Sequence, residues 1–153
     1  MMLHVPQVLS KAAVADIRQQ LDQHTAWIDG QHSAGPQAKK SKHNLQFDPQ
    51  HLVYPALAEQ IEQALRQHPL VQSATLAKHI LRPMFNCYQQ QGTYGNHVDS
   101  AVHYSAAHQQ LIRTDVSMTL FLSEPEEYQG GELVIEDTYG AHEVKLDAGD
   151  VIL

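Results

Sequence analysis

A chain of 153 residues is long enough for one domain that buries its core without disulfides. Its net charge of −7 argues against nonspecific binding to nucleic acid or to anionic membranes, because both need clustered positive charge. The single cysteine, Cys87, cannot form an internal disulfide, and the sequence has neither a signal-peptide pattern nor an apolar run of about 18 residues. A reducing cytoplasm is therefore the expected compartment.

The first helix is expected over residues 11–24, where apolar residues recur at helical spacing along one face. These residues are Val14, Ile17 and Leu21. Ser10 precedes them and can cap the N-terminus with its hydroxyl. Charged and amide side chains occupy the opposite face, so the segment should pack as an amphipathic helix.

A second helix is expected from Pro55, which suits a first turn, to the vicinity of His68 and Pro69. Between the two helices, residues 27–28 predict a short strand. Residues 29–43 have no hydrophobic period and predict a loop, whose basic run at 39–43 should be solvated. Apart from that strand, the two helices precede everything strand-like.

From Leu76 onward the pattern changes to short β-type segments separated by glycines and prolines. The segments are 80–81, 85–88, 97–99, 116–122, 133–135, 143–146 and 151–153. Such spacing is typical of an antiparallel barrel or sandwich. The expected fold is α+β, with a helical support region over residues 1–75 and a jelly-roll core over residues 76–153 in one structural domain.

His97 and Asp99 are the most informative pair in this core. In a β-strand, residues two apart point to the same face, so an imidazole nitrogen and a carboxylate oxygen could bind one cation. Two histidines and one carboxylate on one face form the facial triad of non-heme Fe(II) oxygenases. An isolated pair also arises by chance in solvated turns, so the surrounding residues decide its meaning.

Those residues follow the order Tyr-x-x-x-Gly-x-Tyr-x-x-His-x-Asp, and a Tyr-Gln-Gly-Gly-Glu-Leu segment comes later. The residues concerned are Tyr88, Gly92, Tyr94, His97 and Asp99, then 128–133, then a strand that ends in Gly149 and Asp150. The pattern resembles the prolyl/lysyl hydroxylase branch of the iron- and 2-oxoglutarate-dependent dioxygenases. More narrowly, residues 113–128 and 136–140 are similar to the bacterial PKHD-type hydroxylases (the PiuC iron-uptake group), and the resemblance covers essentially the whole chain.

The resemblance implies a dioxygenase double-stranded β-helix that hydroxylates its substrate while O₂ and 2-oxoglutarate are converted to succinate and CO₂, with L-ascorbate as reductant. It implies that His97 and Asp99 bind Fe(II) and that Tyr88 contacts a carboxylate of 2-oxoglutarate. Tyr94 could line the same pocket or serve in packing. Phe121 stands where the wider branch often has a second tyrosine for the co-substrate, so that hydrogen bond should be absent.

The third iron ligand is not apparent. Family members place a distal histidine a few residues beyond the Gly-Asp strand, followed by an arginine that binds the far carboxylate. Both positions, with the last strands, are expected beyond Leu153 in a longer gene product, so the 153 residues alone should bind iron weakly and turn over little. Weaker candidates within the chain are His142, His103 and His108. Arg113 could pair with an anionic co-substrate or substrate, or with a carboxylate at a strand edge.

Two other function classes stay open. One is a non-catalytic jelly roll that binds a divalent metal or another ligand, and the other is a zinc hydrolase, although a carboxylate without a nearby third His or Cys fits iron better. Oxygen consumption that depends on 2-oxoglutarate would separate the dioxygenase from both. The substrate, a small molecule or a peptide, is not selected by these residues. Selectivity is expected in the loops 29–43 and 100–110, and the oligomeric state is open.

Overall fold

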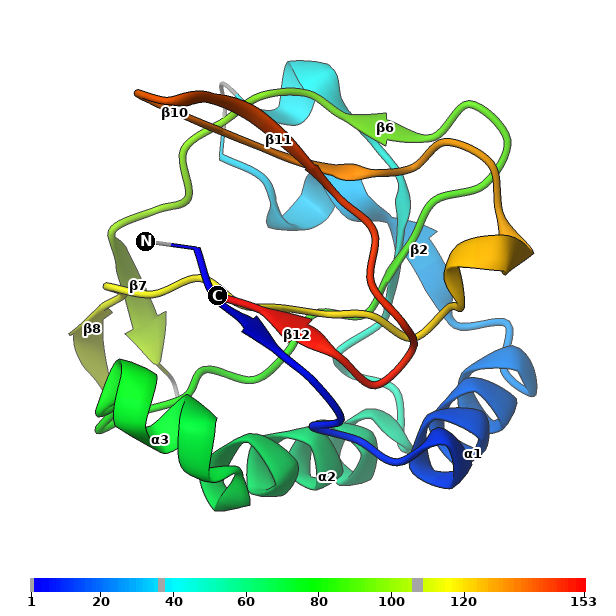
Figure 1. Cartoon of the computed structure of the whole chain (residues 1–153). Coiled ribbons are helices and arrows are strands. Elements are labelled where there is room, and N and C mark those ends of the chain that lie inside the picture. Colours follow the sequence, from blue (N-terminus) through cyan, green and yellow to red (C-terminus); the bar gives the residue numbers. More distant parts are fainter. Residues whose placement is uncertain (1, 36–37, 106–108) are drawn as a thin grey trace.

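The computed structural model describes residues 2–35, 38–105 and 109–153. Within these ranges the helices lie along one side of the molecule and the short strands lie above them (Figure 1). The helices are α1 (Lys11–Asp22), α2 (Tyr54–Gln67) and α3 (Pro69–Thr75), and the 3₁₀ turns are η1 (Gly30–Ser33), η2 (Ala38–Ser41) and η3 (Pro125–Glu127). Among these described helices, none has the length and apolar character that a membrane crossing needs.

The strands are two to five residues long and pair only in the antiparallel sense within the described ranges. They are β1 (His4–Val5), β2 (Trp27–Asp29), β3 (Lys42–His43), β4 (Leu45–Phe47), β5 (Asn86–Cys87), β6 (Thr93–Tyr94), β7 (Val102–Ser105), β8 (Gln110–Arg113), β9 (Thr119–Leu120), β10 (Leu133–Asp137), β11 (Gly140–Val144) and β12 (Val151–Ile152). Their sheets have the orders β1-β12-β9, β2-β4-β5, β3-β6, β7-β8 and β10-β11. The predicted mixture of helices with antiparallel strands is confirmed, and these sheets do not join into one closed barrel within the described ranges.

The first two helices follow the sequence pattern closely. In α1, the Ser10 hydroxyl accepts a hydrogen bond from the Ala13 amide at 3.2 Å, as expected for an N-cap. The predicted apolar face is buried, and the helix ends at Asp22, two residues before the predicted end. In α2, Pro55 occupies the first turn as predicted.

The third helix was not predicted. His68 is extended, with φ −78° and ψ 116°, because a residue before proline is disfavoured in the helical conformation. Pro69 then starts α3, where its missing amide hydrogen costs nothing in a first turn. The proline therefore marks both the predicted end of one helix and the start of another.

Several strand predictions were wrong. No strand forms at residues 80–81 or 97–99, and in the segment 116–122 only β9 is a strand. Residues 29–43 contain η1, η2 and β3 instead of a continuous loop, and β7 and β8 form a hairpin across the segment predicted as a polar loop. Strands of two residues are too short to show the alternation that sequence reading depends on, which is why β1, β3 and β6 were missed.

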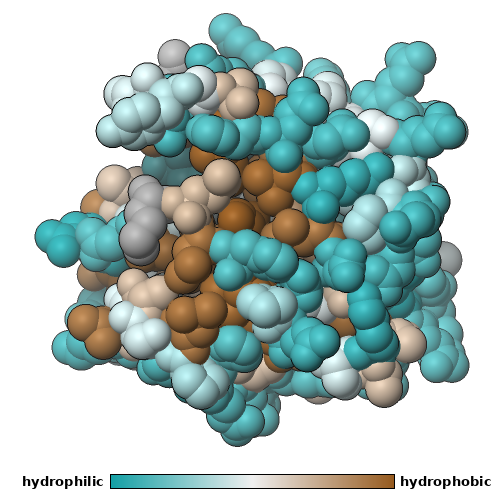
Figure 2. Space-filling view, in the orientation of Figure 1, coloured by the Kyte–Doolittle hydropathy of each residue, from teal (hydrophilic) through white to brown (hydrophobic). Residues whose placement is uncertain are grey.

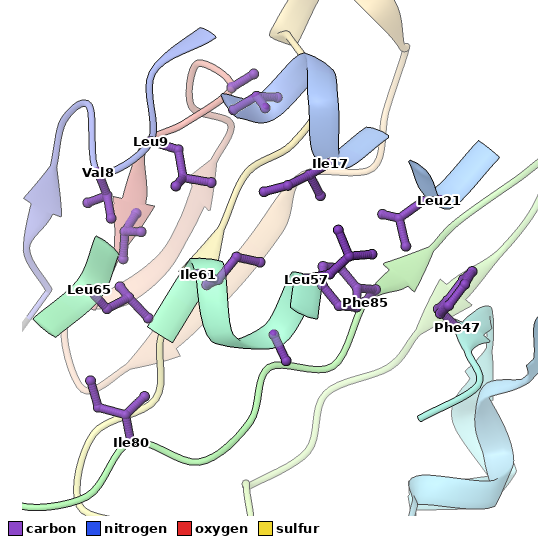
Figure 3. Packing of buried hydrophobic residues seen from close by; sticks show 14 of the residues in the cluster. Val8, Leu9, Ile17, Leu21, Phe47, Leu57, Ile61, Leu65, Ile80 and Phe85 are labelled. Carbon is purple, nitrogen blue, oxygen red and sulfur yellow. The ribbon is translucent and has the colours of Figure 1, made fainter. Parts of the chain in front are cut away.

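One hydrophobic core joins the helices to the strands. In Figure 3, side chains of α2 point toward side chains of α1 and toward the segments before and after the helices. The labelled residues are Val8, Leu9, Ile17, Leu21, Phe47, Leu57, Ile61, Leu65, Ile80 and Phe85. Figure 2 shows further hydrophobic surface in the middle of the face on which both chain ends lie, surrounded by hydrophilic side chains. The core draws on residues both before and after position 75.

Candidate metal centre

His97 and Asp99 lie in the connection between β6 and β7, in irregular backbone and not in the predicted strand. The start of this connection is fixed by the pairing of β6 with β3 and, beyond it, by the Gly95 amide, which donates to the Ser41 carbonyl at 2.9 Å. A side chain at position 95 would come within 3.0 Å of the Ser41 Cβ, so glycine permits this close approach. The backbone is thus fixed two residues before His97.

The two atoms of the pair that could bind a metal face each other. His97 Nε2 and Asp99 Oδ1 are 3.3 Å apart. His97 Nδ1 lies 2.8 Å from the Gly95 carbonyl, which can only accept, so Nδ1 carries a proton; in the neutral imidazole Nε2 is then the atom with the free lone pair. The Ser117 hydroxyl donates to Asp99 Oδ2 at 2.7 Å. Each side chain therefore makes its protein hydrogen bond through one atom, His97 Nδ1 or Asp99 Oδ2. The other atom, His97 Nε2 or Asp99 Oδ1, faces the partner side chain and can bind a ligand. In metal sites such hydrogen bonds orient the ligand side chains.

This arrangement fits two ligands of one divalent cation. Two ligand atoms at about 2.0–2.2 Å from an ion and at right angles to each other are about 3 Å apart. The observed separation of 3.3 Å is close to this value. The His97 side chain is 28% exposed and that of Asp99 is 62% exposed, so the site opens to solvent. In the part of the chain that the structure describes, no third His, Cys, Asp or Glu completes a metal-binding group.

Tyr94 packs directly on the histidine. Its ring stacks on the His97 imidazole with 3.7 Å between centroids and 18° between planes. The pKa of Tyr94 is raised, first by partial burial and then by the negative charge of Asp99. Tyr94 therefore contacts a candidate ligand, whereas its place in a co-substrate pocket stays a prediction.

Tyr88 follows β5 and is half exposed. Its pKa is raised, first by partial burial of the hydroxyl and then by the nearby Tyr94, while Asn44 acts in the opposite direction. Tyr88 is thus near Tyr94, whose ring stacks on His97. Its contact with 2-oxoglutarate remains a prediction.

The alternative third ligands do not join the pair. His142 lies in β11, where its Nε2 is 3.6 Å from Asp137 Oδ1 across the β10-β11 hairpin. Among the described residues His142 forms no group of three with His97 and Asp99, so its role as third ligand stays an untested alternative. The same holds for His103 in β7, and His108 lies outside the described residues.

Arg113 has a protein partner. Its Nε is 2.7 Å from Asp115 Oδ1, and both side chains are exposed. This is the strand-edge ion pair that was one of the two alternatives for this residue.

Phe121 has no hydroxyl that could bind a co-substrate, and its backbone pairs with Gly149 and Asp150.

Lys42 is the residue near the site that sequence reasoning missed. It belongs to the basic run predicted to be solvated, yet it is only 3% exposed. Burial lowers its pKa, while the charges of Asp29 and Asp99 act in the opposite direction. The ammonium lies 4.8 Å from the centroid of the Tyr94 ring.

A sequence signal for this burial exists in hindsight. Lys42, Asn44 and Gln46 alternate along β3 and β4, and all three are buried polar residues. Asn86 Oδ1 accepts hydrogen bonds from Asn44 Nδ2 at 3.1 Å and from Gln46 Nε2 at 2.7 Å. Polar residues at every second position of a strand can therefore indicate a polar row that faces inward, just as alternating apolar residues indicate an apolar inward face.

Comparison with known proteins identifies the family of the chain. The family model of the 2OG-Fe(II) oxygenase superfamily matches residues 83–153, which include His97 and Asp99. That family implies a jelly-roll fold, Fe(II) and 2-oxoglutarate.

The chain is also similar over its whole length to curated bacterial proteins. It is 48% identical to a PKHD-type hydroxylase of Aliarcobacter butzleri and 49% identical to one of Hyphomonas neptunium. It is 45% identical to the PKHD-type hydroxylase PiuC of Pseudomonas aeruginosa. Each comparison covers 100% of this chain and 67% of the relative. The resemblance noted in the sequence is confirmed, and the chain belongs to the PKHD-type hydroxylases of the 2OG-Fe(II) oxygenase superfamily.

Proposed function

We propose that the protein is an Fe(II)- and 2-oxoglutarate-dependent dioxygenase that hydroxylates a small molecule or a peptide. The observation that carries this proposal is the pair formed by His97 Nε2 and Asp99 Oδ1, which are 3.3 Å apart. The other polar atoms of these side chains, Nδ1 and Oδ2, are hydrogen-bonded to the protein. Histidine with carboxylate is the ligand chemistry of non-heme iron sites that keep open positions for substrates. Family membership supports the same metal and co-substrate.

In this proposal the two side chains hold the metal, and the third protein ligand comes from outside the described residues. Bound Fe(II) with 2-oxoglutarate and O₂ supplies the oxidising chemistry that hydroxylates the substrate and releases succinate and CO₂. The Gly95 carbonyl keeps the His97 proton on Nδ1, and Ser117 fixes the carboxylate of Asp99. These contacts orient the ligand atoms before the metal binds.

Tyr88 is proposed to donate its hydroxyl to a carboxylate of 2-oxoglutarate. Partial burial keeps the phenol protonated, since its pKa is raised, and a neutral hydroxyl can donate to an anion. L-ascorbate is proposed as the reductant that restores iron oxidised in unproductive turnover. We place the substrate contacts in residues 100–110, which follow the candidate pair directly, and in residues 29–43, which end in β3, the partner strand of β6.

A metal-binding domain without oxygen chemistry is the second candidate. The observation that favours it is the presence of only two ligands among the described residues. On this reading the pair would bind a divalent cation with low affinity, and 2-oxoglutarate would have no effect on it.

The test is an anaerobic titration with Fe(II) and 2-oxoglutarate, in which the visible metal-to-ligand charge-transfer band is measured. It is run on this chain and on any longer product of its gene. We expect a band that His97→Ala abolishes and that His142→Ala, the matched control in β11, preserves. A band that survives His97→Ala would refute the assignment of the ligands. Metal binding without the band, and without 2-oxoglutarate-dependent oxygen uptake, would favour the second candidate.

A further inference from the structure

Lys42, Tyr94 and His97 form a stack of three groups. The Lys42 ammonium lies 4.8 Å from the Tyr94 centroid, and the His97 imidazole lies 3.7 Å from the same centroid. Tyr94 thus contacts both a cation and the candidate metal ligand.

The backbone fixes this order. Lys42 and Tyr94 are directly paired in the register of β3 and β6, so their side chains start from adjacent positions on one face. The Gly95 amide, bonded to Ser41, continues the pairing toward His97. The stack is therefore built on paired strand backbone, although His97 itself lies outside any strand.

Packing alone does not explain a lysine at this position. Lys42 is 3% exposed, and its ammonium donates to Ser33 Oγ at 2.9 Å. Among the described residues no ion pair joins it to a carboxylate. A buried charge without a direct ion pair is unfavourable, although the charges of Asp29 and Asp99 act on this ammonium, and an apolar side chain of similar length would fill the same space at lower cost. The ammonium does contact a π-system, the ring of Tyr94, over which it lies.

We propose that Lys42 is a positioning residue for the metal-binding pair. Its ammonium attracts the face of the Tyr94 ring and so fixes the plane of that ring. The His97 imidazole stacks on the ring, and this stacking keeps Nε2 directed toward Asp99. One hydrogen bond from Nδ1 to Gly95 leaves the imidazole free to tilt about that bond, whereas the stack fixes its plane. The inference rests on the proposed function in one respect, since it takes His97 to be a metal ligand.

The test compares two uncharged variants with a matched control. Lys42→Met keeps the length of the side chain without the charge, and Lys42→Gln also keeps a donor for Ser33. Lys40→Met makes the same change at an exposed position of η2. Circular dichroism first establishes that each variant is folded.

The first measurement needs no metal. In the NMR spectrum of the metal-free protein, the ring protons of His97 should be shifted upfield by the stacked Tyr94. We expect Lys42→Met and Lys42→Gln to lose much of this shift and Lys40→Met to retain it. This result is independent of catalysis, so it can be read even if the protein forms no 2-oxoglutarate complex.

The second measurement is the dissociation constant for Co(II), used as an air-stable probe of the site. Both Lys42 variants should bind it about tenfold more weakly, at the lower end of the effect of an outer-shell partner. Wild-type shifts and affinity in both variants would overturn the proposal. Loss in Lys42→Met with retention in Lys42→Gln would also overturn it, because the hydrogen bond to Ser33 would then suffice. If the Fe(II) and 2-oxoglutarate titration gives no charge-transfer band, while the Lys42 variants lose the upfield shift of the His97 ring protons, the oxygenase function is refuted and the positioning role of Lys42 is retained.

Discussion

The hydrogen bond from Ser117 to Asp99 offers a direct test of how the metal-binding pair is ordered. Ser117 lies 18 residues after Asp99, in irregular backbone before β9, and its hydroxyl is 2.7 Å from Asp99 Oδ2. Asp99 is largely exposed, so little else holds its carboxylate. In Ser117→Ala the carboxylate should rotate freely, and the facing oxygen, Oδ1, should no longer be directed toward His97.

We expect Ser117→Ala to weaken Fe(II) binding about tenfold, which corresponds to about 1.4 kcal/mol. A hydrogen bond to a charged group can contribute more, about 1.5–3 kcal/mol, but exposure of the carboxylate reduces this value. The assay is anaerobic calorimetric titration of the protein with Fe(II).

Ser73→Ala is the matched control, because it removes a serine hydroxyl that bonds within α3 at 3.1 Å from the Leu70 carbonyl. Ser117→Thr, which keeps the hydroxyl, should retain most of the affinity. Wild-type affinity in Ser117→Ala, in a protein that loses Fe(II) with Asp99→Ala, would show that the carboxylate needs no such support.

The remaining predictions concern stability. Leu57→Ala should lower the free energy of unfolding by about 2–5 kcal/mol, because Leu57 is 1% exposed, whereas Leu52→Ala, at 92% exposed, should change it by less than about 0.5 kcal/mol; denaturant titration compares them. Gly149→Ala should lower thermal stability by more than about 1 kcal/mol, because φ is +101° and a Cβ would lie 2.3 Å from a backbone carbonyl oxygen; an unchanged melting temperature would contradict this. The pKa of Glu124 is held below its ordinary 4.5, first by the hydrogen bond from Lys11, so its stabilisation is complete above pH 4.5 and is lost as the pH falls through the lowered value. Glu124→Gln should flatten that acid limb of the stability profile, measured by urea unfolding at several pH values.

The sequence predicted well the parts of the fold that rest on local chemistry. In α1, a serine cap and three apolar residues at helical spacing are sufficient evidence, because each helical turn makes its own hydrogen bonds. In β3 and β6, each strand has two residues, and the pairing depends on segments about fifty residues apart. Such pairings carry no local signal, so strand positions were the least accurate part of the prediction.

In the candidate site, too, the features that depend on local sequence were predicted better than those that depend on distant pairings. That His97 and Asp99 meet was predicted from their spacing, and they do meet, although through irregular backbone in place of a strand. The burial of Lys42 was not predicted, because a run of lysines is usually solvated; the alternation of Lys42 with Asn44 and Gln46 is its local signal, and the contact with Tyr94 depends on a cross-strand pairing that the sequence does not show. The third ligand could not be tested, because it depends on residues that the structure does not place beside the pair.

The position of β12 between β1 and β9 has a consequence for folding kinetics. β1 holds residues 4–5 and pairs with residues 151–152, and His4 Nε2 lies 2.7 Å from Asp150 Oδ2, 146 positions away. Contacts of such high sequence separation form slowly, because a long loop must close before they stabilise anything. During synthesis the first strand has to wait until residues 151–152 have left the ribosome, while α1 and α2 can already form. We therefore expect the helical layer to fold before the β1-β12-β9 sheet assembles.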